Sequence, residues 1–222
     1  MGDEKCAAIR FENVQYAYPG NSVFLLDAPR LSFAFGTCAA IRGHNGSGKT
    51  TLGKLVAGLL RPSRGRVFVG ETDMTDWPLA KIGSQVGYLF QEPSRQIFAP
   101  TVMEEITFPL TLKGMDKQRA RELALSMLAQ FEMAPLAEAT TFTLSRGEKQ
   151  RLAIAAMLVN HPSFLTLDEP TTGLDTRRKG ILGDMIKRLT DQGVGILLIS
   201  HDAAFVREHA AIVYHMEKGK IV

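Results

Sequence analysis

One segment of this 222-residue chain constrains its fold more than any other, the glycine-rich run GHNGSGKT at residues 43–50. It matches the phosphate-loop pattern GxxxxGK(S/T), follows a short apolar stretch and leads into helix-forming sequence. Glycines in such a loop let successive backbone N–H groups turn toward an anion, and the start of the helix adds partial positive charge. The segment therefore predicts a strand, a phosphate-binding loop and a helix in direct succession.

Two side chains of this segment are expected to act on a bound nucleotide. Lys49 would neutralise the β- and γ-phosphates, and the Thr50 hydroxyl would ligate Mg²⁺. A glycine-rich turn that binds nothing is the alternative, and chance would give the full pattern in roughly one such chain in a hundred. The candidate ATP-binding residues here are Gly43, Asn45, Gly46, Ser47, Gly48, Lys49, Thr50 and Thr51.

A second chemical feature lies at 164–169, where an apolar, strand-like run ends in two carboxylates, Asp168 and Glu169. A magnesium nucleotide needs another protein anchor beside the loop, and a strand that ends in a carboxylate supplies it. We expect Asp168 to hold Mg²⁺ through water, and Glu169 to orient or deprotonate the water that attacks the γ-phosphate. If this run is considered alone, the alternative to a magnesium site is an ordinary strand end followed by a turn.

Alternating strand and helix patterns predict an α/β core with a mostly parallel sheet, beside an antiparallel β layer formed by the first strands. We expect one domain over residues 1–222, in which about 101–159 form a helical subdomain inserted into the core. The expected strands span 9–14, 31–35, 38–41, 67–69, 86–90, 164–167 and 194–200, with a terminal hairpin at 211–214 and 220–222. The expected helices span 49–60, 101–110, 117–130, 146–159 and 175–192.

Composition and charge weigh against several classes of protein. Lysine and arginine number 26 against 23 acidic residues, a net charge of +3 without a long basic run, so nucleic acid is not an expected partner. The longest apolar stretches, 152–159 and 194–199, fall short of the about 18 residues that a membrane-spanning helix needs. Cys6 and Cys38 have no paired spacing, and the N-terminus lacks the apolar core of a signal peptide, so we expect a reducing cytosolic setting.

A further phosphate-binding helix start is expected at LSRGEKQR, residues 144–151, because Ser145 lies near a helix N-terminus with free backbone N–H groups. With this segment the sequence resembles the ATP-binding cassette (ABC) family, whose signature is commonly LSGGQ, over essentially the whole chain. The resemblance implies a P-loop NTPase fold of the ABC type with a RecA-like core, ATPase activity, and ATP and Mg²⁺ as ligands. It also implies that Ser145, Gly147 and Glu148 bind ATP. Arg146 stands where this signature usually has glycine, and Glu148 where it usually has glutamine.

The resemblance also assigns residues outside the two phosphate-binding segments. Tyr18 is similar to the aromatic residue that stacks on adenine, and residues 173–175 are similar to the D-loop. Gln91 resembles the sensor glutamine, expected at the metal and in catalysis, and His201 resembles the catalytic switch histidine. Taken singly, Tyr18 fits a turn aromatic, Gln91 a polar loop residue and His201 a helix cap, but their order along the chain favours the functional assignment.

The segment 87–106 resembles the corresponding part of energy-coupling factor (ECF) ATPases, which power the uptake of vitamins and transition-metal ions. These ATPases carry a second glutamine after the sensor one, here Gln96. In that family the stretch lies under the coupling helices of a transmembrane partner, so apolar Ile97, Phe98 and Ile106 are either docking surface or core. The acidic pair at 104–105, with Glu92, is expected to suit a basic coupling helix.

One phosphate loop and one signature per chain imply a head-to-tail dimer, with ATP between Lys49 of one subunit and Ser145 of the other. The implied partners are a second ABC ATPase subunit, identical or paralogous, a transmembrane coupling subunit and a substrate-binding membrane subunit. The implied location is peripheral, on the cytoplasmic face of the cell membrane. We expect no C-terminal extension after Val222, although many relatives continue into a dimerisation region.

The resemblance therefore implies an ECF-type ABC importer that takes up a vitamin or transition-metal ion. One alternative is the ATPase subunit of another ABC transporter class. The other is a soluble, non-transport ABC ATPase, which normally brings a coiled-coil insertion, zinc cysteines or two cassettes, and this sequence has none of these.

Overall fold

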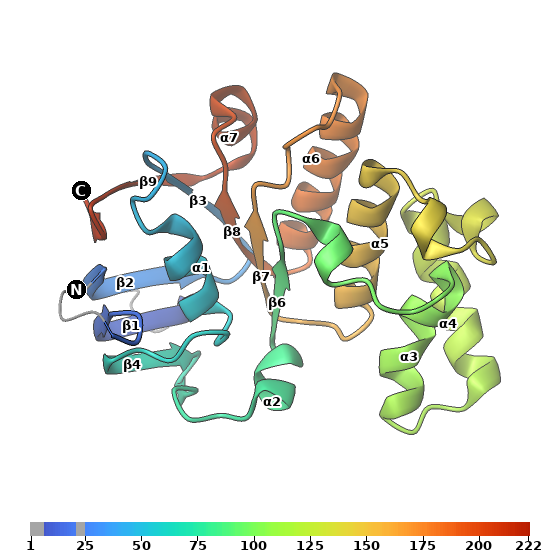
Figure 1. The fold of residues 1–222 in the computed structure, drawn as a ribbon, viewed down its shortest axis with the longest axis horizontal. Coiled ribbons are helices and arrows are strands. Elements are labelled where there is room, and N and C mark those ends of the chain that lie inside the picture. Colours follow the sequence, from blue (N-terminus) through green and yellow to red (C-terminus); the bar gives the residue numbers. More distant parts are fainter. Residues whose placement is uncertain (1–6, 21–24) are drawn as a thin grey trace.

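The computed structural model describes residues 7–20 and 25–222 and contains two β-sheets of different character (Figure 1). The smaller sheet is antiparallel, with strand order β2-β1-β4-β5. Buried side chains such as Phe11, which pairs with Leu31 and Val67, turn one face of this sheet to the core. Its strands are β1 (Ala7–Tyr16), β2 (Leu26–Ala34), β4 (Arg64–Val69) and β5 (Thr72–Asp73).

The larger sheet is mostly parallel, with strand order β10-β9-β3-β8-β7-β6, and β10 pairs antiparallel with β9. Strands β6, β7 and β8 are buried along their whole length, which explains their mostly apolar sequence. The carboxyl ends of the parallel strands meet at one edge, where open α/β sheets bind ligands. The strands are β3 (Cys38–Arg42), β6 (Val86–Leu89), β7 (Phe164–Asp168), β8 (Gly195–Ile199), β9 (Ile212–Glu217) and β10 (Lys220–Ile221).

The helices cover the parallel sheet on both sides (Figure 1). Helix α1 lies between the two sheets, α5 and α6 lie beyond the parallel sheet, and α3 and α4 lie outermost. The α-helices are α1 (Lys49–Val56), α2 (Leu79–Gly83), α3 (Val102–Leu112), α4 (Lys117–Gln130), α5 (Arg146–Leu158), α6 (Thr176–Asp191) and α7 (Ala203–His209). Short 3₁₀ turns span Pro93–Arg95, Ala134–Leu136 and Thr141–Thr143. Within the described ranges, no helix combines the length and the apolar character that crossing a bilayer requires.

Two apolar cores hold these layers together. One joins the antiparallel sheet and α1 to the near face of the parallel sheet, through residues such as Phe11, Leu52 and Leu197. The other joins α3, α4, α5 and α6 to the far face, through residues such as Ile106 and Leu165. The parallel sheet therefore lies between two separately packed apolar cores, one on each of its faces.

The predicted fold class is confirmed, with an antiparallel sheet, a mostly parallel sheet and a group of helices. The helix expected over 49–60 is shorter than predicted, because it ends at Val56 and Gly58 follows with a positive φ of 63°. Ile106 is core rather than docking surface, since it is fully buried. The expected acidic surface at 104–105 is wrong for Glu105, which is only 4% exposed. Cys6 lies outside the described residues, and Cys38 is a buried free thiol.

Candidate functional site

A cavity of about 570 Å³ lies at the carboxyl edge of the parallel sheet and brings together most of the predicted site residues. It is bounded by the phosphate loop, by the segment after β6 and by the ends of β7 and β8. The predicted residues that line it are Asn45, Gly46, Gly48, Lys49, Thr50, Thr51, Gln91, Asp168, Glu169 and His201. Segments separated by more than 150 residues in the sequence thus converge on one space.

The phosphate loop has the backbone that its glycines were expected to allow. Gly46 and Gly48 adopt positive φ angles of 78° and 107°, and Gly48 caps α1. A Cβ on Gly43 would collide with the backbone carbonyl of Met216, so the loop lies directly against β9. The Ser47 hydroxyl is buried in the loop and has no hydrogen-bond partner among the described residues.

Lys49 is the buried cation of this loop. Its Nζ donates hydrogen bonds to the carbonyl oxygens of Gly43 and His44, at 2.8 and 2.9 Å. Burial lowers the pKa of Lys49, while the nearby carboxylates of Glu169 and Asp168 act in the opposite direction. Carbonyl oxygens are weak partners for an ammonium group, so a phosphate entering this loop would be a stronger acceptor.

Asp168 ends strand β7 and is held by a residue that the sequence did not single out. The Tyr88 hydroxyl donates a 2.8 Å hydrogen bond to Asp168 Oδ2, and both side chains are buried. Tyr88 lies on β6, where it pairs with Thr166 two residues before the aspartate. Its hydroxyl is the one side-chain polar group in β6, and that was a signal in the sequence. This contact fixes the orientation of the Asp168 carboxylate.

Glu169 has an unusual backbone and a desolvated carboxylate. Its φ is 51°, and its N–H donates to the carbonyl of Ile199 at 2.8 Å. Oε2 accepts from the His201 backbone N–H at 3.3 Å, and Oε1 lies 3.3 Å from His201 Nε2 without hydrogen-bond alignment. Burial raises the pKa of Glu169, and contacts with His201 partly offset this effect. A carboxylate with a raised pKa and a free oxygen is suited to accept a proton from water.

Gln91 and Tyr18 take different positions relative to the cavity. Gln91 lines it close to Thr50 and Asp168, where a glutamine oxygen has access to a metal ion. Tyr18 is not among the lining residues, but its hydroxyl lies 3.3 Å from Thr51 Oγ1 at the start of α1. Its ring packs edge-on against Tyr16 and stays 39% exposed, so a roughly planar ligand has access to it.

Ser145, Gly147 and Glu148 do not line this cavity within the same chain. Ser145 caps α5, its Oγ accepts from the Glu148 N–H at 3.4 Å, and the Glu148 carboxylate accepts from the Ser145 N–H at 2.7 Å. This capping box lowers the pKa of Glu148, chiefly through the hydrogen bond to Ser145. ATP binding by Glu148 stays a prediction, and it would require the carboxylate to leave this cap.

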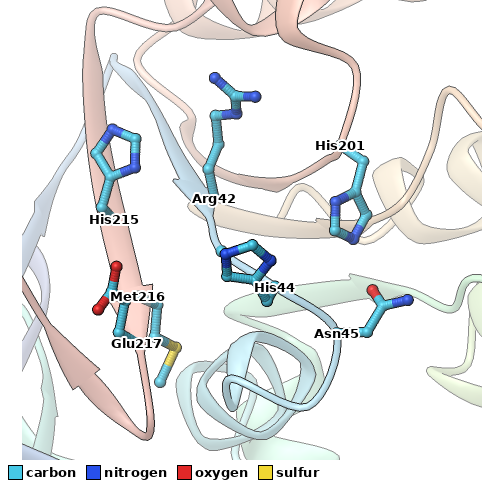
Figure 2. Close-up of a pocket in the computed structure, with 8 residues that line it drawn as sticks. Arg42, His44, Asn45, His201, His215, Met216 and Glu217 are labelled. Atoms are coloured by element: carbon cyan, nitrogen blue, oxygen red, sulfur yellow. The ribbon is translucent and has the colours of Figure 1, made fainter.

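A wider cavity of about 690 Å³ adjoins the site on the other side of the phosphate loop. Figure 2 shows Arg42, His44, His201 and His215 around it, and Asn45 and His201 line both cavities. Arg42 and His215 pair in register on neighbouring strands, so their side chains share one face of the sheet. The sequence pattern singled out neither residue, because their proximity depends on strand order.

A magnesium ion fits the donor set of the cavity of about 570 Å³ at the carboxyl edge of the sheet. The part of the chain that the structure describes holds no cluster of three or more His, Cys, Asp or Glu side chains that suits a metal ion. A site built from one carboxylate, a hydroxyl and an amide matches Mg²⁺, which is usually bound by one or two carboxylates together with substrate phosphates. Thr50, Gln91 and Asp168 supply these groups.

Comparison with known proteins finds relatives that carry the same kind of name. The profile of the family described as "ABC transporter" matches residues 26–172. A protein of Caldanaerobacter subterraneus subsp. tengcongensis, named as an ABC transporter ATP-binding protein, is 40% identical over 213 residues, which cover 96% of this chain and 37% of that protein. A protein of Pyrococcus furiosus with the same name is 38% identical over 86% of this chain and 73% of its own length. The chain spans about a third of the length of several relatives, such as 30% of one from Methanosarcina acetivorans.

Solved structures agree with the sequence relatives. CbiO1 from Clostridium perfringens, part of the ABC transporter complex cbiONQ, has a TM-score of 0.87 and 28% identity over 97% of this chain and 87% of its own. The dimeric ATP-binding cassette MJ0796, in a post-hydrolysis state bound to ADP and Pi, has a TM-score of 0.84 and 25% identity over 96% of both chains. Fold, phosphate loop and relatives agree, and this chain belongs to the ABC transporter family as a nucleotide-binding ABC ATPase domain.

Proposed function

We propose that this chain is the ATP-hydrolysing subunit of an ECF-type ABC importer. Closure and opening of an ATPase dimer would power the uptake of a vitamin or transition-metal ion through membrane subunits. One observation carries the catalytic part of this proposal, the convergence of Lys49, Asp168, Glu169 and His201 on a single cavity. A phosphate anchor, a metal-binding carboxylate and a general base for the hydrolysis of a magnesium nucleotide would thus share one space.

The proposed chemistry assigns a task to each side chain. Lys49 and the backbone N–H groups of the loop bind the β- and γ-phosphates, and Tyr18 stacks on adenine. Thr50, Gln91 and Asp168 hold Mg²⁺, which when bound offsets phosphate charge. The Glu169 carboxylate accepts a proton from water while the water oxygen attacks the γ-phosphorus and the bond to the ADP oxygen breaks. His201 stays beside Glu169 and keeps its carboxylate directed into the cavity.

A second chain completes the site in this proposal. Ser145 and Gly147 do not line the cavity of their own chain, so the Ser145 hydroxyl and the start of α5 are available to ATP bound by a partner cassette. The dimeric state of the MJ0796 cassette supports this arrangement. The partner is either an identical chain or a paralogue.

The importer assignment rests on the segment between β6 and α3. Gln96, the second glutamine, accepts a 3.0 Å hydrogen bond from the Phe90 backbone N–H and so shapes the loop after Gln91. Nearby lies an apolar groove of about 390 Å³, where Leu79, Phe98 and Phe108 are 62%, 64% and 47% exposed. We propose that a helix of the transmembrane coupling subunit occupies this groove and that the chain is peripheral on the cytoplasmic face of the membrane. The similarity to cbiO1 supports this assignment over another transporter class or a soluble ABC ATPase.

Two measurements test the proposal. Phosphate release from ATP should require Mg²⁺ and should be abolished in Lys49→Ala, whereas Lys117→Ala, an exposed lysine on α4, serves as the matched control. Wild-type turnover by Lys49→Ala would reject the site. Co-purification from a native membrane fraction, with mass identification of the partners, should recover a coupling subunit and a substrate-binding subunit. Recovery of subunits of another ABC class would reject the ECF assignment but leave the ATPase assignment intact.

A further inference from the structure

Arg146 is the residue at which this chain departs from the common signature, and its side chain reaches far beyond α5. Its Nη2 donates a 3.3 Å hydrogen bond to the backbone carbonyl of Gln91, 55 residues earlier in the sequence. Its Cδ, Nε and Cζ lie over Gly173, at 3.5 to 3.7 Å from the position that a Cβ would take there. One exposed side chain thus joins the start of α5, the segment after β6 and the turn before α6.

The chemistry of arginine suits this bridge. Among the residues that the structure describes, no carboxylate lies within 4 Å of the Arg146 guanidinium, so its charge is not used in an ion pair. A guanidinium offers several N–H donors at the end of a long stem, and its flat face packs over a glycine backbone. The glycine usual in this signature can make neither contact.

The three joined segments face different ATP sites in the proposed dimer. Gln91 lines the cavity of its own chain, and Arg146 shares a smaller cavity of about 370 Å³ with Gln91, Thr50 and Asp168. Ser145 and Gly173 do not line the chain's own nucleotide cavity, and we have proposed that Ser145 serves the partner's. A contact between Arg146 and Gln91 therefore spans the two half-sites.

We propose that Arg146 is a positioning residue that couples the two half-sites of one chain. By holding Gln91, Ser145 and Gly173 in one arrangement, it makes the surface offered to the partner depend on the occupancy of the chain's own phosphate loop. The coupling role rests on the proposed dimer, whereas the bridge itself is a property of a single chain. The two parts are therefore tested separately.

Amide hydrogen exchange of the nucleotide-free protein tests the bridge. Arg146→Ala should exchange about 3- to 10-fold faster in peptides that cover 90–96 and 171–174, because the bond to the Gln91 carbonyl and the packing on Gly173 are lost. Arg177→Ala is the matched control, since Arg177 is an exposed arginine in the first turn of α6. Its exchange should match wild type, and the unfolding temperature of both variants should stay within a few degrees of it. Unchanged exchange in both peptides of Arg146→Ala would overturn the bridge.

The coupling is tested by adding MgADP, which lacks the γ-phosphate and so does not require a closed dimer. In wild type, MgADP should slow exchange around Lys49 and also at 145–149. In Arg146→Ala, protection around Lys49 should persist, and protection at 145–149 should be lost. Equal protection at 145–149 in both proteins would overturn the coupling. If the exchange results hold but no ATP-bound dimer forms with either an identical or a paralogous cassette, the proposed function fails and the bridge stands.

Discussion

Glu169 shows at the scale of a single residue how the fold builds a reactive group. Its φ of 51° is unfavourable for a residue with a Cβ, by about 1–3 kcal/mol, and it persists only where neighbours determine it. The bond from its N–H to Ile199 and the bond to its Oε2 from the His201 backbone provide that restraint. The result is a half-buried carboxylate directed at the nucleotide cavity, with one oxygen that has no hydrogen-bond partner in the part of the chain that the structure describes.

The raised pKa of Glu169 predicts the pH dependence of hydrolysis. A general base works only when deprotonated, and burial moves its pKa above the ordinary 4.5. The acidic limb of kcat should therefore lie above 4.5, with activity falling as the pH decreases through it. Phosphate release at saturating MgATP, measured across pH, checks this. In Glu169→Gln the rate should drop about a hundred- to ten-thousand-fold. A limb at or below pH 4.5 in the wild-type protein would contradict Glu169 as the base.

Tyr88 is predicted to set the affinity of the metal site without contacting nucleotide. Tyr88→Phe keeps the ring but removes the hydroxyl that orients Asp168, so metal binding should weaken by roughly 10-fold, as when other groups that orient metal ligands are lost. Titration of Mg²⁺ against a fluorescent ADP analogue reports this directly, while binding of the analogue in excess EDTA should not change.

Tyr214→Phe is the control for that experiment, because the Tyr214 hydroxyl donates to the Ser32 carbonyl at 3.3 Å, on the β2 side of the molecule. The Mg²⁺ affinity of Tyr214→Phe, measured in the same titration, should match that of the wild-type protein. An unaltered Mg²⁺ titration in Tyr88→Phe would show that Asp168 needs no such support.

At the scale of elements, Glu105 joins α3 to the loop that precedes it. Its Oε2 accepts from the backbone N–H groups of Phe98 and Ala99, at 3.1 and 2.8 Å. Burial raises the pKa of Glu105, and these two bonds partly offset the effect. The carboxylate thus satisfies a turn that has no ladder partner of its own.

Removal of this carboxylate should lower the free energy of unfolding of the protein rather than weaken its binding to a membrane partner. Glu105→Ala leaves two N–H groups without their acceptor at a cost of about 1–3 kcal/mol, so the unfolding temperature should fall by about 2–10 °C. Calorimetry checks this, with Glu122→Ala, an exposed position on α4, expected within about 0.5 kcal/mol of wild type. Glu105→Gln keeps one acceptor oxygen and should recover part of the loss. Equal melting of Glu105→Ala and wild type would contradict this account.

Sequence pattern predicted the elements whose periodicity or end signals are strong. The helix expected over 117–130 matches α4, and the 146–159 helix matches α5 to within one residue. The short α2 and β5 were not predicted, because elements of five and two residues depend on tertiary contacts rather than on local pattern. The phosphate loop and Asp168 came from motif spacing. Tyr88 and Arg42 did not, since only the order of strands in the sheet brings them to the site.

At the scale of the whole molecule, the proposed dimer would draw half of each ATP site from one of two surfaces of the chain. The phosphate loop and Glu169 open into one cavity, while the N-terminus of α5, with Ser145, lies outside it. Helix α5 has 13 residues, and its N-cap Ser145 and first residue Arg146 are exposed, so its N-terminus is open to the phosphates of a nucleotide bound by another chain. The molecule is therefore expected to act in pairs, and each nucleotide should become part of the interface.

The dimer is tested most sharply by uncoupling closure from hydrolysis. Glu169→Gln keeps the shape of the side chain and removes the base, whereas ATP binding depends on Lys49, Thr50 and the partner's Ser145. The variant should bind MgATP, close and accumulate as an ATP-bound dimer of about twice 24.4 kDa in size-exclusion chromatography with light scattering. The free energy of the closing contacts must outweigh the cost of the translational and rotational freedom lost on association, so the measurement belongs at high protein concentration.

The double variant Lys49→Ala/Glu169→Gln should remain monomeric at the same concentration, since it lacks the phosphate anchor. Hydrolysis by Glu169→Gln within about threefold of wild type would refute Glu169 as the base. Loss of hydrolysis with only monomer at every concentration would instead refute ATP-driven pairing of identical chains, leaving a paralogous cassette as the partner to be tested in the same assay.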